Sequence, residues 1–156
     1  MPDFTLNSDA RFEALPEFAQ GYVEALFFTN GDTGDADDED KLNRLGTARL
    51  TAKALHSIRA TCAAFERTHA DLLTAAYEHP GYGPRDAGCD LWFTRQGHGA
   101  GYWDRGFPRP LSDALTEAAK TLGGCEMEVW RRIPSQLNLV PAERGCRDGN
   151  RSDPVR

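Results

Sequence analysis

The segment richest in chemically useful side chains is 93–106, FTRQGHGAGYWDRG. It places one histidine, one aspartate, two arginines and four glycines within fourteen residues. A general base needs a group that orients it, so His98 and Asp104 are a candidate base and its partner. Arg95 and Arg105 could hold an anion. No serine or cysteine nucleophile stands beside His98, so the pattern lacks the third member of a triad, and we assign no catalytic residue.

The same segment also has a structural interpretation. Glycines supply the positive φ angles and bulges of a tight β-hairpin, and Tyr102 and Trp103 would then anchor the core. Gly97, Gly99 and Gly101 form G-x-G-x-G, which lacks the Lys-Ser/Thr of a phosphate-binding loop. We favour the structural interpretation. The alternative is a binding surface made of Arg95, His98, Tyr102, Trp103, Asp104 and Arg105.

Metal binding has little support in the sequence. The four histidines and four cysteines form no familiar ligand pattern, and no Cys-x-x-Cys pair is present. Cys62 and His69 could share one helix face, but a buried thiol and a half-exposed imidazole explain that spacing. The thiols are expected to be reduced, because no secretion signal precedes them. We therefore predict no metal and no cofactor.

Charge is unevenly distributed along the chain. Residues 1–40 contain eleven acids and one base, a balance of −10, and residues 41–156 contain thirteen acids and seventeen bases, a balance of +4, which together give −6. The acids are densest in 29–41, TNGDTGDADDEDK, which we expect to be a loop because it has no large apolar side chain.

Such a row of carboxylates has two interpretations. It can be a solvated loop, or it can imitate the phosphate charge of nucleic acid and occupy a basic groove of another protein. Its spacing does not match the calcium loop of an EF-hand. The candidate protein-binding residues are Asp32, Asp35, Asp37, Asp38, Glu39 and Asp40.

Periodicity predicts the elements that would position these groups. Apolar residues at helical spacing predict helices at 16–28, 51–78 and 112–122. Thr51 and Ser112 are the expected N-caps of the last two. Alternation and β-branched or aromatic residues predict strands at 90–95, 100–104, 125–130 and 136–140.

This order predicts an α+β fold. N-terminal helices would pack on a small antiparallel sheet, and the C-terminal half would run hairpin, helix, hairpin. The 156-residue length suits one domain over 1–140, followed by a disordered tail at 141–156. No signal peptide or apolar run of about 18 residues is present, so we expect a protein of the cytoplasm with no membrane contact.

One long motif carries a resemblance. FTRQGHGAGYWDRG, followed by LSDALTEAAKTLGG, resembles a family of small proteins carried by bacteriophages, prophages and plasmids. The similarity covers Asp90 to about Val140, and the family's usual "V-G-D-D-G" turn is replaced here by 131–135, RRIPS. The resemblance implies the cytoplasm of a bacterial host, and it implies no particular activity.

Together these features predict an accessory protein of a phage or mobile element that acts by binding. Its partner would be a host protein or protein–nucleic-acid complex, and the acidic loop would make it an inhibitor of the anti-CRISPR or anti-restriction type. One alternative is a small enzyme built on His98 and Asp104. The other is a nucleic-acid-binding protein, which the net charge disfavours and which would use Arg95, Arg105, Arg109, Arg131 and Arg132 around Trp92, Tyr102 and Trp103. The sequence does not indicate an oligomeric state.

Overall fold

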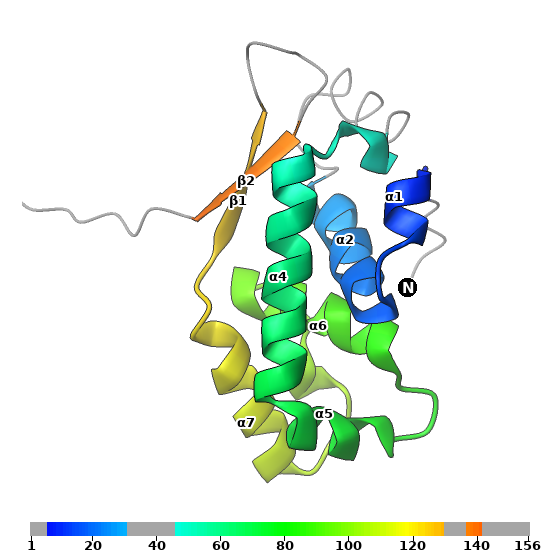
Figure 1. Cartoon of the computed structure of the whole chain (residues 1–156). Coiled ribbons are helices and arrows are strands. Elements are labelled where there is room, and N and C mark those ends of the chain that lie inside the picture. The colour runs from blue at the N-terminus through cyan, green and yellow to red at the C-terminus, as the bar shows by residue number, and fades with distance from the viewer. Residues whose placement is uncertain (1–5, 31–45, 130–136, 142–156) are drawn as a thin grey trace, which may run out of the picture.

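The computed structural model describes residues 6–30, 46–129 and 137–141 (Figure 1). In chain order the elements are α1 (Ala10–Glu13), α2 (Glu17–Asn30), the 3-10 helix η1 (Gly46–Arg49), α4 (Ala52–Thr68), α5 (Ala70–Tyr77), α6 (Pro84–Gln96), the 3-10 helix η2 (Tyr102–Asp104), α7 (Arg109–Lys120), β1 (Cys125–Val129) and β2 (Leu137–Pro141).

The centre of the fold is the pair α2 and α6. A helix over 16–28 is confirmed as α2, which buries its apolar residues on nearly every side, because α6 and α4 both pack against it. Glycine allows the unusually close approach to α6. A Cβ on Gly21 would stand 1.8 Å from the carbonyl oxygen of Arg85, and one on Gly88 would stand 1.8 Å from that of Phe18. The two backbones therefore touch where side chains normally separate helices.

The expected hairpin at 90–104 is wrong, because this segment begins inside α6. Pro84 occupies the first helical turn, and the Asp86 carboxylate accepts a hydrogen bond from the Gly83 N–H (2.9 Å). Gly97 ends the helix with a φ of 72°, which is the usual left-handed C-terminal conformation. Aromatic residues favoured the strand prediction, yet Leu91 and Trp92 are fully buried by packing around a helix.

The α+β prediction is therefore wrong, and the described residues form a helical domain. A single two-stranded antiparallel ribbon accompanies the helices there, with Met127 of β1 opposite Leu139 of β2. The ribbon contacts the side of α4 and supplies no sheet for the helices to cover (Figure 1). Helix-on-helix packing of α2, α4, α6 and α7 replaces the expected sheet as the organising contact.

Two helix boundaries also differ from expectation. The helix expected at 51–78 is capped by the Thr51 hydroxyl as predicted, but it breaks at His69, whose φ and ψ are −117° and 29°, into α4 and α5. The last helix begins at Arg109 instead of 112. Its first turn contains Pro110, and Ser112 is a buried helical residue and not an N-cap. Proline suits this first turn because its missing N–H would have no partner there.

Some predictions fall outside the described residues. These are the acidic candidates at 32–40, Arg131 and Arg132, and the tail at 142–156. Within the described ranges, no helix combines the length and the apolar character that crossing a membrane requires.

Candidate functional site

Arg105 of the motif is held inside the domain by Asp90. The Asp90 side chain has no exposed surface, and it accepts hydrogen bonds from Arg105 Nε (2.8 Å) and Nη2 (2.5 Å) and from the Tyr82 hydroxyl (2.8 Å). Burial raises the pKa of Asp90, and the bonds from Arg105 and Tyr82 oppose that rise. Arg105 compensates a buried carboxylate, so its Nε and Nη2 are occupied within the domain.

Arg95 is also committed to internal contacts. Its guanidinium donates to the Tyr22 hydroxyl (2.7 Å) and to the carbonyl oxygen of Gly123 (2.9 Å). The neighbouring Gln96 accepts from the backbone N–H of Cys125 (2.7 Å) and donates to the carbonyl of the same residue. Together these two side chains tie the end of α6 to the chain that leaves α7 and enters β1.

The remaining motif residues do not assemble a catalytic pair. His98 and Asp104 are both exposed, and no hydrogen bond or ion pair joins them. The His98 ring instead lies edge-on to Phe93, with centroids 6.0 Å apart. A base that is not oriented by its expected partner lacks the geometry of general base catalysis.

The aromatic residues of the motif have divided roles. Tyr102 is fully buried, as expected, and its hydroxyl donates to the carbonyl of Ala87 (2.8 Å). Trp103 was expected in the core and is 41% exposed. Trp92 is fully buried and donates from Nε1 to the Thr29 hydroxyl (2.8 Å). Trp92 and Tyr102 therefore cannot stack on nucleic-acid bases without unfolding of the core.

No cluster of three or more metal-ligating side chains occurs in the described part of the chain. Its three cysteines are free thiols. Cys62 is buried as predicted, and Cys89, also buried, donates from Sγ to the carbonyl of Gly21 (3.1 Å). Burial raises the pKa of Cys89 to about 12, so this thiol is a packing residue and not a nucleophile.

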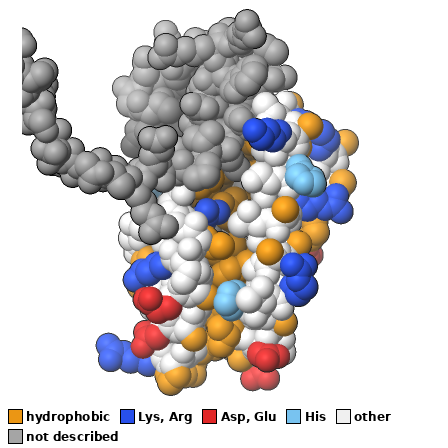
Figure 2. Space-filling model, turned by 60° about the vertical axis from the view of Figure 1, so that its left-hand side comes forward, with side chains coloured by type: hydrophobic (Ala, Val, Ile, Leu, Met, Phe, Trp, Pro, Cys, Tyr) orange, Lys and Arg blue, Asp and Glu red, His pale blue; other side chains and the backbone are white. Residues whose placement is uncertain are grey.

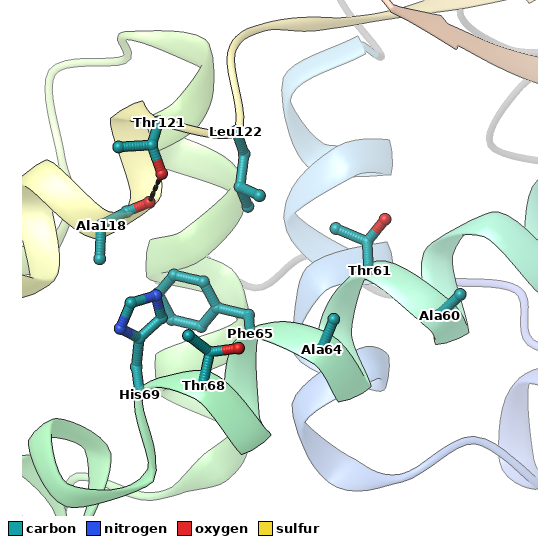
Figure 3. A pocket seen from close by; sticks show the side chains of 9 residues that line it. All are labelled: Ala60, Thr61, Ala64, Phe65, Thr68, His69, Ala118, Thr121 and Leu122. Atoms are coloured by element: carbon teal, nitrogen blue, oxygen red, sulfur yellow. Dashed lines mark hydrogen bonds between the residues drawn. The ribbon is translucent and has the colours of Figure 1, made fainter.

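The described residues line a groove of about 510 Å³ between α4 and the end of α7 (Figure 3). One wall comes from successive turns of α4 and the break after it, with Ala60, Thr61, Ala64, Phe65, Thr68 and His69. The other wall comes from the end of α7 and the residues that follow it, with Ala118, Thr121 and Leu122. We call this feature the α4/α7 groove.

Its lining is mostly carbon. The Phe65 ring is 3% exposed, and it lies parallel to the Tyr102 ring at 6.3 Å and close to the His69 ring at 4.7 Å. The Thr121 hydroxyl is already used, because it donates to the carbonyl of Ala118 (2.7 Å; Figure 3). Leu122 is 39% exposed, so part of its aliphatic side chain lies in the groove wall in contact with water. Such a lining suits contact with apolar side chains and not a reaction.

The two edges of the α4/α7 groove differ in charge. Arg67 stands seven residues after Ala60, so both project along one line of α4 at the outer edge of the groove, and Lys53, seven residues before Ala60, extends that line about two helical turns beyond the lining. On the other edge Glu117 of α7 is exposed, with Lys120 Nζ 3.6 Å from its carboxylate. Figure 2 shows a strip of hydrophobic side chains running between polar rows.

The sequence contained a weak signal for this groove that motif analysis misses. Ala60, Ala64 and Thr68 recur every four residues, so α4 presents a line of small side chains next to its buried stripe. The apolar stripe predicted for the last helix also includes Leu122, which lies just beyond the end of α7. Neither pattern indicates that the two helices diverge enough to leave a space.

Comparison of the chain with protein-family models, with curated proteins and with solved structures gives no match. The resemblance to phage and plasmid proteins therefore rests on the motif alone. Because the motif residues that face inward stabilise the fold, we take the α4/α7 groove as the candidate site.

Proposed function

We propose that this protein is an accessory protein of a phage or mobile element and acts by binding a host protein or protein–nucleic-acid complex. The observation that carries the proposal is the concentration of charge at the front of the chain, where residues 1–40 have a balance of −10 within a protein of net charge −6. Charge of one sign steers a protein toward a partner of the opposite sign. A basic, nucleic-acid-processing target such as a restriction or CRISPR nuclease fits this charge.

The roles of the motif residues support binding over the two alternatives. An enzyme built on His98 and Asp104 would need a hydrogen bond between those side chains, and none joins them. A nucleic-acid surface would need free arginines and exposed aromatic rings, whereas Arg95 and Arg105 bond internally and Trp92 is buried. Among the described residues of that alternative, Arg109 and Trp103 are exposed. An acidic protein is also repelled by phosphate.

The test removes the charge and keeps the shape. One variant carries Asp35→Asn, Asp37→Asn, Asp38→Asn, Glu39→Gln and Asp40→Asn. Host strains that each contain one defined restriction or CRISPR nuclease are infected with a susceptible phage, and plaque formation is compared with and without the protein. The parent protein should protect the phage against one such nuclease. The variant should lose at least about tenfold of that protection, because screened attraction to a basic surface is removed.

A matched control neutralises five exposed acids elsewhere, at Glu17, Asp71, Glu78, Asp104 and Asp113. This variant should protect like the parent if the position of the charge matters, and unlike the parent if only net charge matters. Equal protection by the 35–40 variant would contradict an acidic contact. A rise in its affinity for labelled single-stranded DNA would favour the nucleic-acid alternative.

A further inference from the structure

We infer that the α4/α7 groove binds one amphipathic helix of a partner protein, with apolar side chains in the groove and acidic side chains facing α4. This contact is separate from the acidic segment and does not depend on it. The inference rests on three properties of the groove: its size, the small side chains of its α4 wall, and the cations along its α4 edge.

The size and shape suit side chains projecting from a helix. A space of about 510 Å³ lies within the range of roughly 300–1,000 Å³ that is typical of sites for small ligands, so it accepts a few large side chains and not a whole helix. Ala60, Ala64 and Thr68 keep the α4 wall low, which lets a second backbone approach closely. Helix-in-groove recognition uses apolar anchors at i, i+3 or i+4, and i+7, and their spacing matches a groove that runs along a helix.

The positive charges on α4 favour a partner helix that has acidic side chains on the flank facing α4. Lys53 and Arg67 lie on the groove side of α4, and exposed His56 lies on the same half of the helix. The one carboxylate in α4 is Glu66, six residues after Ala60, which places it on a different side of the helix. Carboxylates of a bound helix would therefore meet cations at the α4 edge and no repelling acid of α4 there.

The difference between the two edges gives the bound helix an orientation. Glu117 stands one helical turn before Thr121, so it lies beside the groove on the side opposite Lys53 and Arg67. Glu117 is paired with Lys120, so the α7 edge has no net charge, and a helix with acids on one flank is favoured in the rotation that turns those acids toward α4. Nucleic acid is a poor occupant, because the floor of the groove is mostly apolar.

The experiment uses the full chain and designed peptides, with chemical shifts of backbone amides as the readout. The first peptide is a helix with Leu at i, i+4 and i+7, Glu on one flank and Lys on the other. The second peptide replaces the Glu flank by Lys, and the third replaces the Leu anchors by Ser. The first should shift the amides of Ala60, Ala64, Thr68 and Ala118, whereas the second should bind at least about tenfold more weakly and the third should not bind.

Matched variants of the protein assign the contact. Lys53→Glu with Arg67→Glu should weaken binding of the first peptide and strengthen binding of the second. Arg59→Glu removes one cation from a different side of α4 and should change neither. Ala60→Trp fills the groove from an exposed position and should abolish binding, while Ala63→Trp, also exposed and outside the groove, should preserve it.

Several results would overturn the inference. Equal affinity of the first two peptides, or loss of binding in Ala63→Trp as well as Ala60→Trp, would show that the contact is not specific to this groove. Shifts in the same amides that grow with protein concentration alone would make a second copy of the chain the occupant. Absence of shifts with all three peptides would contradict a helix-binding groove, even if the 35–40 variant still lost phage protection.

Discussion

Residues 82–107, which contain the motif at 93–106 and which we call the motif segment, and the α4/α7 groove use their side chains in opposite ways. In the motif segment the residues that stand out in the sequence are arginine, aspartate, tyrosine and tryptophan, and many of them are bonded inside the protein. The groove is built mostly from alanine and threonine, with Phe65, His69 and Leu122, which form no recognisable motif, and it is open. In this chain, therefore, many of the residues that look chemically distinctive stabilise the fold. The candidate binding surface is made mostly of small and apolar residues.

The two regions should also differ in how much their side chains contribute to the free energy of unfolding. Removing one member of a buried polar network leaves its partner without compensation, which is costly. Removing a side chain that is already half in water costs little. Substitutions in the two regions should therefore differ strongly in their effect on stability.

The largest expected effect follows from removing the arginine that pairs with Asp90. Arg105→Ala leaves a fully buried carboxylate with only the Tyr82 hydroxyl as a partner, and we expect a loss of about 3–5 kcal/mol in the free energy of unfolding. Urea denaturation at pH 7 measures it. Arg109→Ala is the control, since Arg109 is exposed, and it should stay within about 0.5 kcal/mol of the parent. If Arg105→Ala and Arg109→Ala both lowered the free energy of unfolding by the same small amount, Arg105 would be available to bind a partner.

A smaller effect is expected where α2 and α6 touch. Gly88→Ala places a methyl group 1.8 Å from the carbonyl oxygen of Phe18, so the helices must separate, at a cost of about 1–3 kcal/mol. Gly99→Ala is the matched control, because a Cβ there meets no atom within 4 Å. Thermal unfolding of the two variants measures the difference. A Gly88→Ala variant as stable as Gly99→Ala would show that the close helix contact is absent in solution.

Local signals in the sequence account for part of this fold. The period of 16–28 predicts α2, the Thr51 hydroxyl predicts the start of α4, and Cys62 is a core residue as expected. The same local rules could have found α6. Pro84, Asp86 and Gly97 are a start signal, a cap and a stop signal for a helix, but the aromatic content of 90–95 led to a strand prediction.

The candidate site could not be predicted in the same way. Whether Arg105 is free depends on Asp90, fifteen residues away, being buried by other helices. The groove depends on how α4 and α7 diverge after α4 stops at His69, and no local pattern encodes that distance. Long-range packing therefore decides both which motif residues are used internally and where the surface is hollow.

The smallest expected effect concerns two leucines near each other in the chain. Leu115 has no exposed surface on α7, whereas Leu122, one residue beyond the C-cap, is 39% exposed in the groove wall. Leu122→Ser should cost about 1 kcal/mol in the free energy of unfolding, because more than a third of the side chain is already in water. Leu115→Ser, with the same chemical change, should cost at least about 2–5 kcal/mol, because it leaves a cavity and buries a hydroxyl.

Urea denaturation of these two variants is also a direct test of whether the groove is open in solution. If Leu122 is exposed to water in the free protein, its hydrophobic contribution is made only when a partner covers it. Leu122→Ser should then cost far less stability than Leu115→Ser and weaken binding of the Leu-anchored peptide. If instead Leu122→Ser destabilises the protein as much as Leu115→Ser does, the end of α7 closes onto α4, and the groove is filled by the protein's own side chains. That outcome would remove the contrast between the two regions, because both would then serve the fold alone.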